Sequence, residues 1–316
     1  MPSQLWVTDS LGGSLSNPKL SKSIRHQALA EYAFRQFVTI KEAMGAHRDD
    51  TVQFDKILKI DTKGGTITET ATIPEHNWKV IQGSVVIAEY ANAVPWSHKL
   101  ETLSEFDVND LSARALKDDW VEVLDSAAAV QFGSGLFRAV CTSTSSTVFT
   151  SNGAAVATAA AQMSDKNWRD IIDKLMTKKT PRFEDGNFRA ILSINAMRGI
   201  YDYLQAIMQY TSAEFTHNNE VGWYYNCRAV RETSYLSNAV GSGSAYGEAI
   251  FFGNEAVLEA VAEAEHVVMK VPTDYGRSKG VSWQALLGYK KIWDLTADDA
   301  NSVGTGIERI LKMTSA

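Results

Sequence analysis

Thr51-Val-Gln-Phe-Asp-Lys-Ile-Leu-Lys-Ile60 and Thr66-Ile-Thr-Glu-Thr-Ala-Thr-Ile73 flank the short segment Asp61-Thr-Lys-Gly-Gly65. Apolar side chains at alternate positions predict a strand on each side, and the paired glycines suit the positive φ angles of a hairpin turn. The sequence therefore predicts a long polar hairpin over 51–73. Because an isolated two-stranded hairpin is marginally stable, we expect it to lie on its own chain or on a neighbouring subunit. An ordinary hairpin within a larger sheet is the alternative interpretation.

A long helix is predicted over 107–132. Asp107 is placed to cap its first turn, and Gly133 to end it as the residue after the C-cap. Apolar residues that recur every three or four positions predict its buried face: Val108, Leu111, Ala115, Leu116, Trp120, Val123, Leu124, Ala127 and Val130. The residues expected on the solvated face are Asp110, Lys117, Asp118, Asp119, Glu122 and Asp125. Asp118 and Asp119 do not indicate a metal or acid–base pair, since adjacent side chains diverge around a helix.

Composition limits the function classes. The chain has 316 residues, 45% of them hydrophobic, which is enough for one large domain or two moderate ones. Its 31 basic and 37 acidic residues give a net charge of −6, so no excess of basic charge favours tight or sequence-specific nucleic-acid binding. The balance is compatible with enclosing DNA without binding it.

Cysteine use and hydropathy bear on the compartment. Cys141 and Cys227 are the two cysteines, and we expect both to be buried free thiols in a reducing environment. The first residues lack the basic and apolar regions of a secretory signal, and no run approaches the ~20 apolar residues of a membrane span. The sequence therefore predicts a soluble protein made in the cytoplasm, without a membrane partner.

The rest of the chain divides into an N-terminal part and an α/β part. Residues 1–20 read as an extended arm, 21–39 as a helix, 80–94 as a strand and 141–155 as a surface loop. From 164 to 270 strands and helices alternate, which indicates an α/β domain. Its predicted elements are a helix capped by Ser164 and ended by Pro181, strands 188–194, 224–231 and 248–252, and a helix over 196–208. The last 45 residues are predicted to be rich in strand.

No motif predicts catalysis, a cofactor or a metal. Gly241-Ser-Gly-Ser-Ala-Tyr-Gly247 has the wrong spacing for a phosphate loop and precedes a strand, so we interpret it as a flexible loop. Ser16-Asn-Pro-Lys19 is a chance S-x-x-K match in a polar arm, and the six histidines are scattered without metal-ligand spacing. The expected protein is not an enzyme.

Lys63 lies at the tip of the predicted hairpin. A lysine there could form an isopeptide bond with an asparagine of another subunit, which requires a desolvated neutral amine and a nearby carboxylate base. A solvated lysine in a turn is the simpler interpretation, and the sequence favours it.

Three later segments, in their order after the hairpin and helix, carry a family resemblance. They are Asn219-Glu-Val-Gly-Trp-Tyr-Tyr-Asn-Cys-Arg-Ala-Val-Arg-Glu-Thr233, Ala249-Ile-Phe-Phe-Gly-Asn-Glu-Ala256, and Asp274-Tyr-Gly-Arg-Ser-Lys-Gly-Val-Ser-Trp283 running into Leu287-Gly-Tyr-Lys-Lys-Ile-Trp-Asp294. Over about residues 24–316 the chain resembles major capsid proteins of tailed bacteriophages with the Hong Kong 97-type fold, most closely the coliphage N-four-like branch. Asn195-Ala196 departs from the His-Pro of many relatives, at a place where no chemistry is expected.

The resemblance implies an α+β capsid fold divided along the chain. Residues 1–45 would be the N-terminal arm, and 46–79 the extended hairpin loop that lies across a neighbouring subunit. Residues 80–132 would form the peripheral domain with its long spine helix, 133–270 the axial domain, and 271–316 the return to the peripheral domain.

The resemblance also implies a function. Copies would form hexamers and pentamers of an icosahedral head around double-stranded DNA, without sequence-specific binding, in a virion assembled in the host cytoplasm. A portal and decoration proteins are possible partners, and a separate scaffolding protein is expected because no long charged N-terminal extension is present. The expected inter-subunit contacts are Lys63, Gly64, Gly65, Tyr289, Lys290, Lys291 and Trp293.

Three alternatives stay open. An encapsulin-like nanocompartment would share the fold and enclose protein cargo. A phage tail or decoration protein would form rings or trimers instead of closed shells. A small-molecule enzyme of α/β type would need convergent polar residues in a pocket, which the sequence does not indicate.

Overall fold

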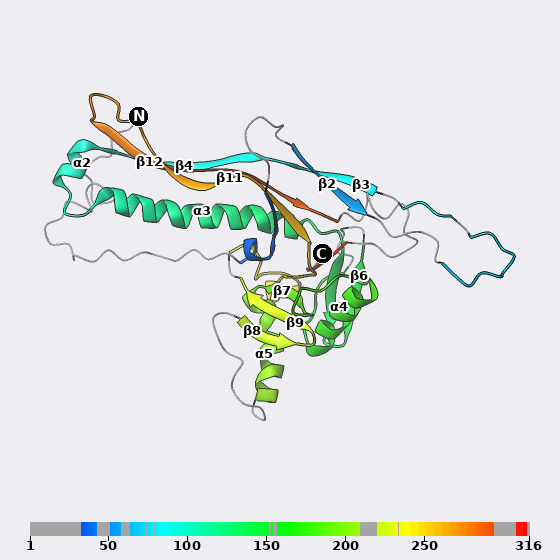
Figure 1. Ribbon diagram of the computed structural model, residues 1–316. Coiled ribbons are helices and arrows are strands. Elements are labelled where there is room, and N and C mark those ends of the chain that lie inside the picture. The colour runs from blue at the N-terminus through cyan, green and yellow to red at the C-terminus, as the bar shows by residue number, and fades with distance from the viewer. Residues whose placement is uncertain are drawn as a thin grey trace.

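The structure, a computed structural model, has a long limb, a compact lobe and a segment that projects from the limb (Figure 1). It describes residues 33–42, 51–57, 64–73, 75–78, 80–151, 153, 157–208, 220–232, 234–293 and 308–314. The limb is a four-stranded sheet with a long helix along it, and the lobe is built on a seven-stranded sheet. The predicted α+β class is confirmed.

The sheet of the limb joins distant parts of the chain. Its strands, in spatial order, are β1 (Thr39–Glu42), β11 (Val257–Met269), β12 (Ser278–Lys291) and β4 (Ala88–Ser97). β1 runs parallel to β11, and the other neighbours are antiparallel. The strand predicted over 80–94 is two strands, β3 (Val80–Val86) and β4, because the chain leaves one sheet at Ile87 and enters another.

The predicted long helix is confirmed as α3 (Val108–Gly133), which packs on β12 and β4. The carboxylate of Asp107 accepts the N–H of Asn109 at 2.9 Å and of Asp110 at 3.4 Å, which satisfies donors of the first turn. A short helix, α2 (His98–Leu103), precedes it. The buried residues of α3 are Val108, Ser112, Leu116, Val121, Leu124, Ala128, Ala129 and Phe132.

Several details of the helix prediction are wrong. Ala115 and Val130, predicted on the buried face, are exposed. Asp119, predicted on the solvated face, is partly buried and accepts the indole N–H of Trp283 at 2.7 Å.

Gly133 is the last helical residue and not the residue after the C-cap; a Cβ there would lie 2.8 Å from the Tyr235 hydroxyl, so a larger residue would require the Tyr235 side chain to shift. Asp125 is not on a solvated face, because its carboxylate accepts the N–H of Phe34 at 2.8 Å and of Arg35 at 2.9 Å. Burial raises the pKa of Asp125, against the opposing effect of these N–H donors.

Within residues 33–39, the described part of the helix predicted over 21–39, the structure has no α-helix. Residues 21–32 lie outside the described part, and the chain then makes a single 3₁₀ turn, η1 (Arg35–Phe37), before β1. Phe34 is fully buried against Phe132 and Tyr235, with ring centroids 5.8 and 5.7 Å away. Aromatic burial therefore fastens this segment to the end of α3.

The seven-stranded sheet of the lobe mixes parallel and antiparallel neighbours. In spatial order its strands are β6 (Ser146–Thr150), β5 (Arg138–Ser143), β13 (Ile310–Met313), β10 (Ala249–Phe252), β7 (Phe188–Leu192), β9 (Cys227–Arg231) and β8 (Glu220–Tyr224). β13 runs parallel to β5 and β7 parallel to β9. The predicted strands over 188–194 and 248–252 are confirmed.

Both faces of this sheet are buried at its centre. Ile250 and Phe252 belong to the core shared with α3 and the limb, whereas Ala249 and Phe251 belong to the core under α4 (Asp165–Thr177) and α5 (Ile194–Met208). The continuous apolar run of β10 is what a strand covered on both sides requires. Both predicted helices are confirmed, although α4 ends at Thr177, before Pro181. The cap by Ser164 is confirmed as well, since its Oγ accepts the N–H of Asn167 at 3.3 Å.

Two loop and strand predictions in the lobe are wrong. Residues 141–155 are not wholly a loop, since β5 and β6 form a hairpin that buries Cys141. The strand predicted over 224–231 is the hairpin of β8 and β9, which turns at Tyr225 and Asn226 with φ of 45° and 57°. Cys141 and Cys227 are buried free thiols as predicted, and burial raises the pKa of Cys141 to about 12.

The predicted hairpin over 51–73 has the wrong second strand. β2 (Thr51–Ile57) pairs antiparallel with β3, with Thr51 opposite Val86 and Ile57 opposite Val80. Residues 66–73 form no strand and are exposed. Gly83 lies opposite Phe54, and a Cβ there would be 2.4 Å from the Phe54 ring, so this pairing needs glycine on β3. We call β2, β3 and the described residues of 64–78 between them the projecting segment.

Sheet membership crosses the predicted domain boundaries, as β11 and β13 show. β11 falls within the predicted axial range 133–270 but pairs in the limb with β12. β13 falls within the predicted peripheral range 271–316 but pairs in the lobe with β10 and β5. The chain passes between limb and lobe after α3, after β10 and after β12.

Candidate functional site

The stem of the projecting segment is anchored on the limb. Val52, Phe54 and Val85 are buried and pack in one small core with Leu258 and Ala260 of β11. The stem therefore has a fixed direction, and the described residues of 64–78 extend beyond the ends of β2 and β3 (Figure 1).

Large apolar side chains of the projecting segment are exposed in the described structure. The exposed fraction is 70% for Ile73 and 60% for Trp78. The other exposed apolar residues of the segment are Ile57, Ile67, Val80 and Val86. Aromatic and aliphatic residues gathered on one protruding element are typical of a surface that another molecule covers.

Among the residues predicted at the tip, Lys63 lies outside the described residues. Gly64 and Gly65 are exposed, and a Cβ on either would meet nothing within 4 Å. Neither is required to be glycine by packing within the chain. The tip contact stays a prediction.

The predicted residues at the end of β12 behave differently from one another. Tyr289 is buried and donates its hydroxyl to Glu259 at 3.2 Å, and Lys291 is buried in an ion pair with Glu308 at 2.9 Å. Both side chains make polar contacts inside the subunit, and a role for either in contacts between subunits stays a prediction. Lys290 is exposed, and the half-buried ring of Trp293 lies 4.3 Å from the Arg309 guanidinium.

Sequence reasoning missed a second exposed apolar surface, at the distal end of the limb. The turn between β11 and β12 exposes Met269, Val271 and Tyr275, beside α2 in Figure 1. Tyr275 is fully exposed and has a left-handed φ of 54°. The sequence signal is Asp274-Tyr-Gly276, which has the turn residues of a tight reversal with a large aromatic residue among them.

A buried charge cluster, also missed from the sequence, fixes the N-terminal segment. Arg35 forms ion pairs with Glu259 and Glu265 of β11, each at 2.9 Å. Burial lowers the pKa of Arg35, but the hydrogen bonds to Glu265 and Glu259 outweigh it and the pKa is raised. Burial also raises the pKa of Tyr289, which faces Glu259. These paired charges have a structural role, because each has a partner within the cluster.

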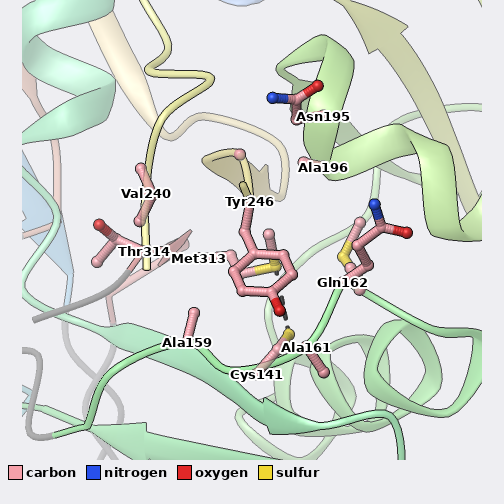
Figure 2. Close-up of a pocket in the computed structure, with 12 residues that line it drawn as sticks. Cys141, Ala159, Ala161, Gln162, Asn195, Ala196, Val240, Tyr246, Met313 and Thr314 are labelled. Atoms are coloured by element: carbon pink, nitrogen blue, oxygen red, sulfur yellow. Dashed lines mark hydrogen bonds between the residues drawn. The ribbon is translucent and has the colours of Figure 1, made fainter. Parts of the chain in front are cut away.

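A small cavity in the lobe offers no chemistry. Its volume is about 10 Å³, roughly the room that one water molecule needs. Figure 2 shows Tyr246 among the residues that line it and the thiol of Cys141 directed at the sulfur of Met313, 3.6 Å away. The loop predicted from Gly241 to Gly247 forms part of its wall at Tyr246 and Gly247.

The described part of the chain holds no group of three or more His, Cys, Asp or Glu residues arranged for a metal ion. Within the same residues, none of the helices combines the length and apolar character needed to cross a membrane. The surfaces that stand out are therefore the exposed apolar ones.

Comparison with solved structures identifies the fold. The capsid of cyanophage P-SCSP1u is similar over 96% of this chain and 94% of that chain, with a TM-score of 0.67 and 9% identity. The capsid of Ralstonia phage GP4 is similar over 95% of this chain and 95% of that chain, with a TM-score of 0.66 and 15% identity. The capsid of cyanophage Pam1 is similar over 95% of this chain and 97% of that chain, with a TM-score of 0.64 and 16% identity. No family model matches the sequence, and no curated protein matches it. The chain has the fold of these phage capsid structures.

Proposed function

We propose that this chain is the major capsid protein of a tailed bacteriophage, and that its copies assemble into a closed icosahedral shell. The similarity to phage capsid structures over nearly the whole length of both chains supports this proposal. In detail we propose the Hong Kong 97-type arrangement, with the limb as peripheral domain, α3 as spine helix and the lobe as axial domain. The coliphage N-four-like branch is part of the proposal and rests on the sequence resemblance.

The observation that carries the proposal is the projecting segment. Its stem is fixed by the core around Phe54, while Ile73 and Trp78 remain exposed. A fixed stem with an uncovered apolar end suits a contact in which one surface of a subunit meets a different surface of the next. Such heterologous contacts close into rings, which are the hexamers and pentamers of a shell. Many moderate contacts then stabilise the shell together.

The proposed partners follow from the same role. They are other copies of the chain, a separate scaffolding protein, a portal, decoration proteins and packaged double-stranded DNA. The net charge of −6 favours confinement of the DNA over specific binding. Assembly in the host cytoplasm belongs to the proposal as well.

The test is expression of the chain alone and together with a candidate scaffolding protein, followed by negative-stain electron microscopy. Closed shells or capsomer rings are expected. Particles that hold protein cargo and no DNA in infected cells would favour the encapsulin-like alternative, and rings or trimers alone would favour a tail or decoration protein. A uniform monomer under both conditions would contradict the capsid proposal.

A further inference from the structure

Three connections join limb and lobe: 134–137 after α3, 253–256 after β10, and the chain from 292 into β13. Glu308 and Arg309, the two residues immediately before β13, contact all three connections. At the junction, where these three connections lie, two adjacent residues of opposite charge make contacts to each of them.

Glu308 holds the first connection. Its fully buried carboxylate accepts the N–H of Leu136 at 2.8 Å and of Phe137 at 3.0 Å. Lys291, the last residue of β12, pairs with the same carboxylate at 2.9 Å and donates to the Ser134 carbonyl at 3.4 Å. One carboxylate thus ties the end of α3 to the end of β12.

Arg309 holds the second connection. Its Nη1 donates to the Asn254 carbonyl at 2.8 Å and pairs with Glu255 at 3.0 Å, and its own carbonyl accepts the N–H of Gly253 at 3.1 Å. The guanidinium also lies over the ring of Trp293, 4.3 Å from its centroid.

The ring of Trp293 also lies near the projecting segment. The ammonium of Lys56, a buried residue of β2, lies 6.0 Å from the centroid of the same ring. Cations near an aromatic ring are attracted by its quadrupole. The dipeptide therefore connects the limb, the lobe and the stem of the projecting segment.

We propose that Glu308 and Arg309 form a clasp that sets the angle between limb and lobe and, through it, the curvature of the shell. This inference rests on the proposed function. Apolar packing at the junction, such as Phe132 on Phe252, is non-directional. Charge-assisted hydrogen bonds are directional, so they select one angle among several that bury similar area. An angle error repeated in every subunit changes whether and where a shell closes.

The test uses the double variant Glu308→Gln/Arg309→Met, the single variants, and Asp110→Asn as matched control. Asp110 forms an exposed ion pair with Arg114 on α3, and neither side chain contacts Glu308 or Arg309 in any described interaction. Amide exchange of Leu136 and Phe137 is measured on unassembled subunits, and shell diameters by negative-stain microscopy. Glu308→Gln is expected to speed exchange at these two amides about ten- to a hundredfold, since a hydrogen bond to a charged group is lost.

The double variant is expected to fold and to give shells of mixed diameter, whereas wild type and Asp110→Asn give one diameter. Unchanged exchange in Glu308→Gln would overturn the clasp. Faster exchange with shells of one wild-type diameter would overturn its role in curvature. If wild type forms no shells, the proposed function fails, and the exchange result still decides the clasp. If the double variant does not fold, Arg309→Lys, which keeps the charge but loses the planar fork, takes its place with the same expected mixture.

Discussion

The central sheet of the lobe and the projecting segment are both built from apolar strand residues, but they bury them differently. Neighbouring residues Ile250 and Phe251 on β10 are both fully buried, one on each face of the sheet. On the stem, Val52 and Phe54 are buried and Ile57 is exposed. The lobe therefore completes its core within one subunit, whereas the projecting segment leaves large apolar side chains exposed, which we propose that a neighbouring subunit covers.

Phe251→Ala gives the largest expected effect and tests the lobe side of this comparison. Phe251 is fully buried, and its ring lies 5.0 Å from that of Trp168. Removing a buried aromatic ring should lower the free energy of unfolding by about 3–5 kcal/mol. Denaturant unfolding measures this, with exposed Val86→Ala as the control. A loss under about 1 kcal/mol would mean that the lobe core is not closed as described.

Trp78→Ser tests whether the projecting segment contributes to assembly and not to the stability of the subunit. Because Trp78 is exposed in the subunit, its loss should change the free energy of unfolding by no more than about 0.5 kcal/mol. Assembly into shells should nevertheless fall sharply, measured by sedimentation and electron microscopy. Glu69→Gln, a polar change at an exposed position of the same segment, is the control. Normal shells from Trp78→Ser would remove this residue from the proposed contact.

Asp107→Ala tests how much the N-cap of α3 stabilises the limb. The change removes the acceptor for two N–H groups at the start of α3, so the free energy of unfolding should fall by about 1 kcal/mol. Thermal unfolding measures this, and exposed Glu122→Ala within the same helix should have little effect. Equal effects of the two substitutions would argue against a capping role.

The smallest effect concerns pH. The hydrogen bond from Arg35 lowers the pKa of Glu265 below its usual 4.5, although burial opposes this. A carboxyl with a lowered folded pKa stabilises the fold above the unfolded pKa, and this contribution is lost as pH falls through the folded value. Glu265→Gln should therefore cost about 0.5–1 kcal/mol at neutral pH after solvent screening. Unfolding measured from pH 7 to 3 should show the two proteins converging below about pH 4.5.

Exposed Glu263→Gln is the control for the pH experiment. It should follow the wild-type stability curve closely. A difference between wild type and Glu265→Gln that stays constant down to pH 3 would contradict the assigned ion pair.

The sequence predicted the elements whose signals are local. Asp107 and Ser164 cap the helices that follow them, and the apolar run of β10 predicts a buried strand. The pairing of β2 was not predictable in this way. The alternation of Thr and Ile over 66–73 and the glycines at 64–65 match a hairpin, but strand pairing depends on distant packing, here Phe54 over Gly83.

The candidate sites show the same division. The sequence predicted that the polar segment 51–73 would lie on another surface, but it placed the contact at Lys63, Gly64 and Gly65 and did not indicate Trp78. The strand assigned to Ile67 and Ile73 was wrong. The buried positions of Tyr289 and Lys291 depend on Glu259 and Glu308, which are remote in the sequence, so no local pattern indicates them. The turn between β8 and β9 was missed for a similar reason. Its left-handed residues are Tyr225 and Asn226, so no glycine marks the turn in the sequence.

The most direct test of the central claim is a cryo-electron microscopy map of the assembled wild-type protein. The account predicts closed shells in which residues 64–78 of one subunit lie across a neighbouring subunit, with Ile73 and Trp78 covered by it. Particles in which this segment folds back on its own subunit, or in which Trp78 remains in solvent, would contradict it.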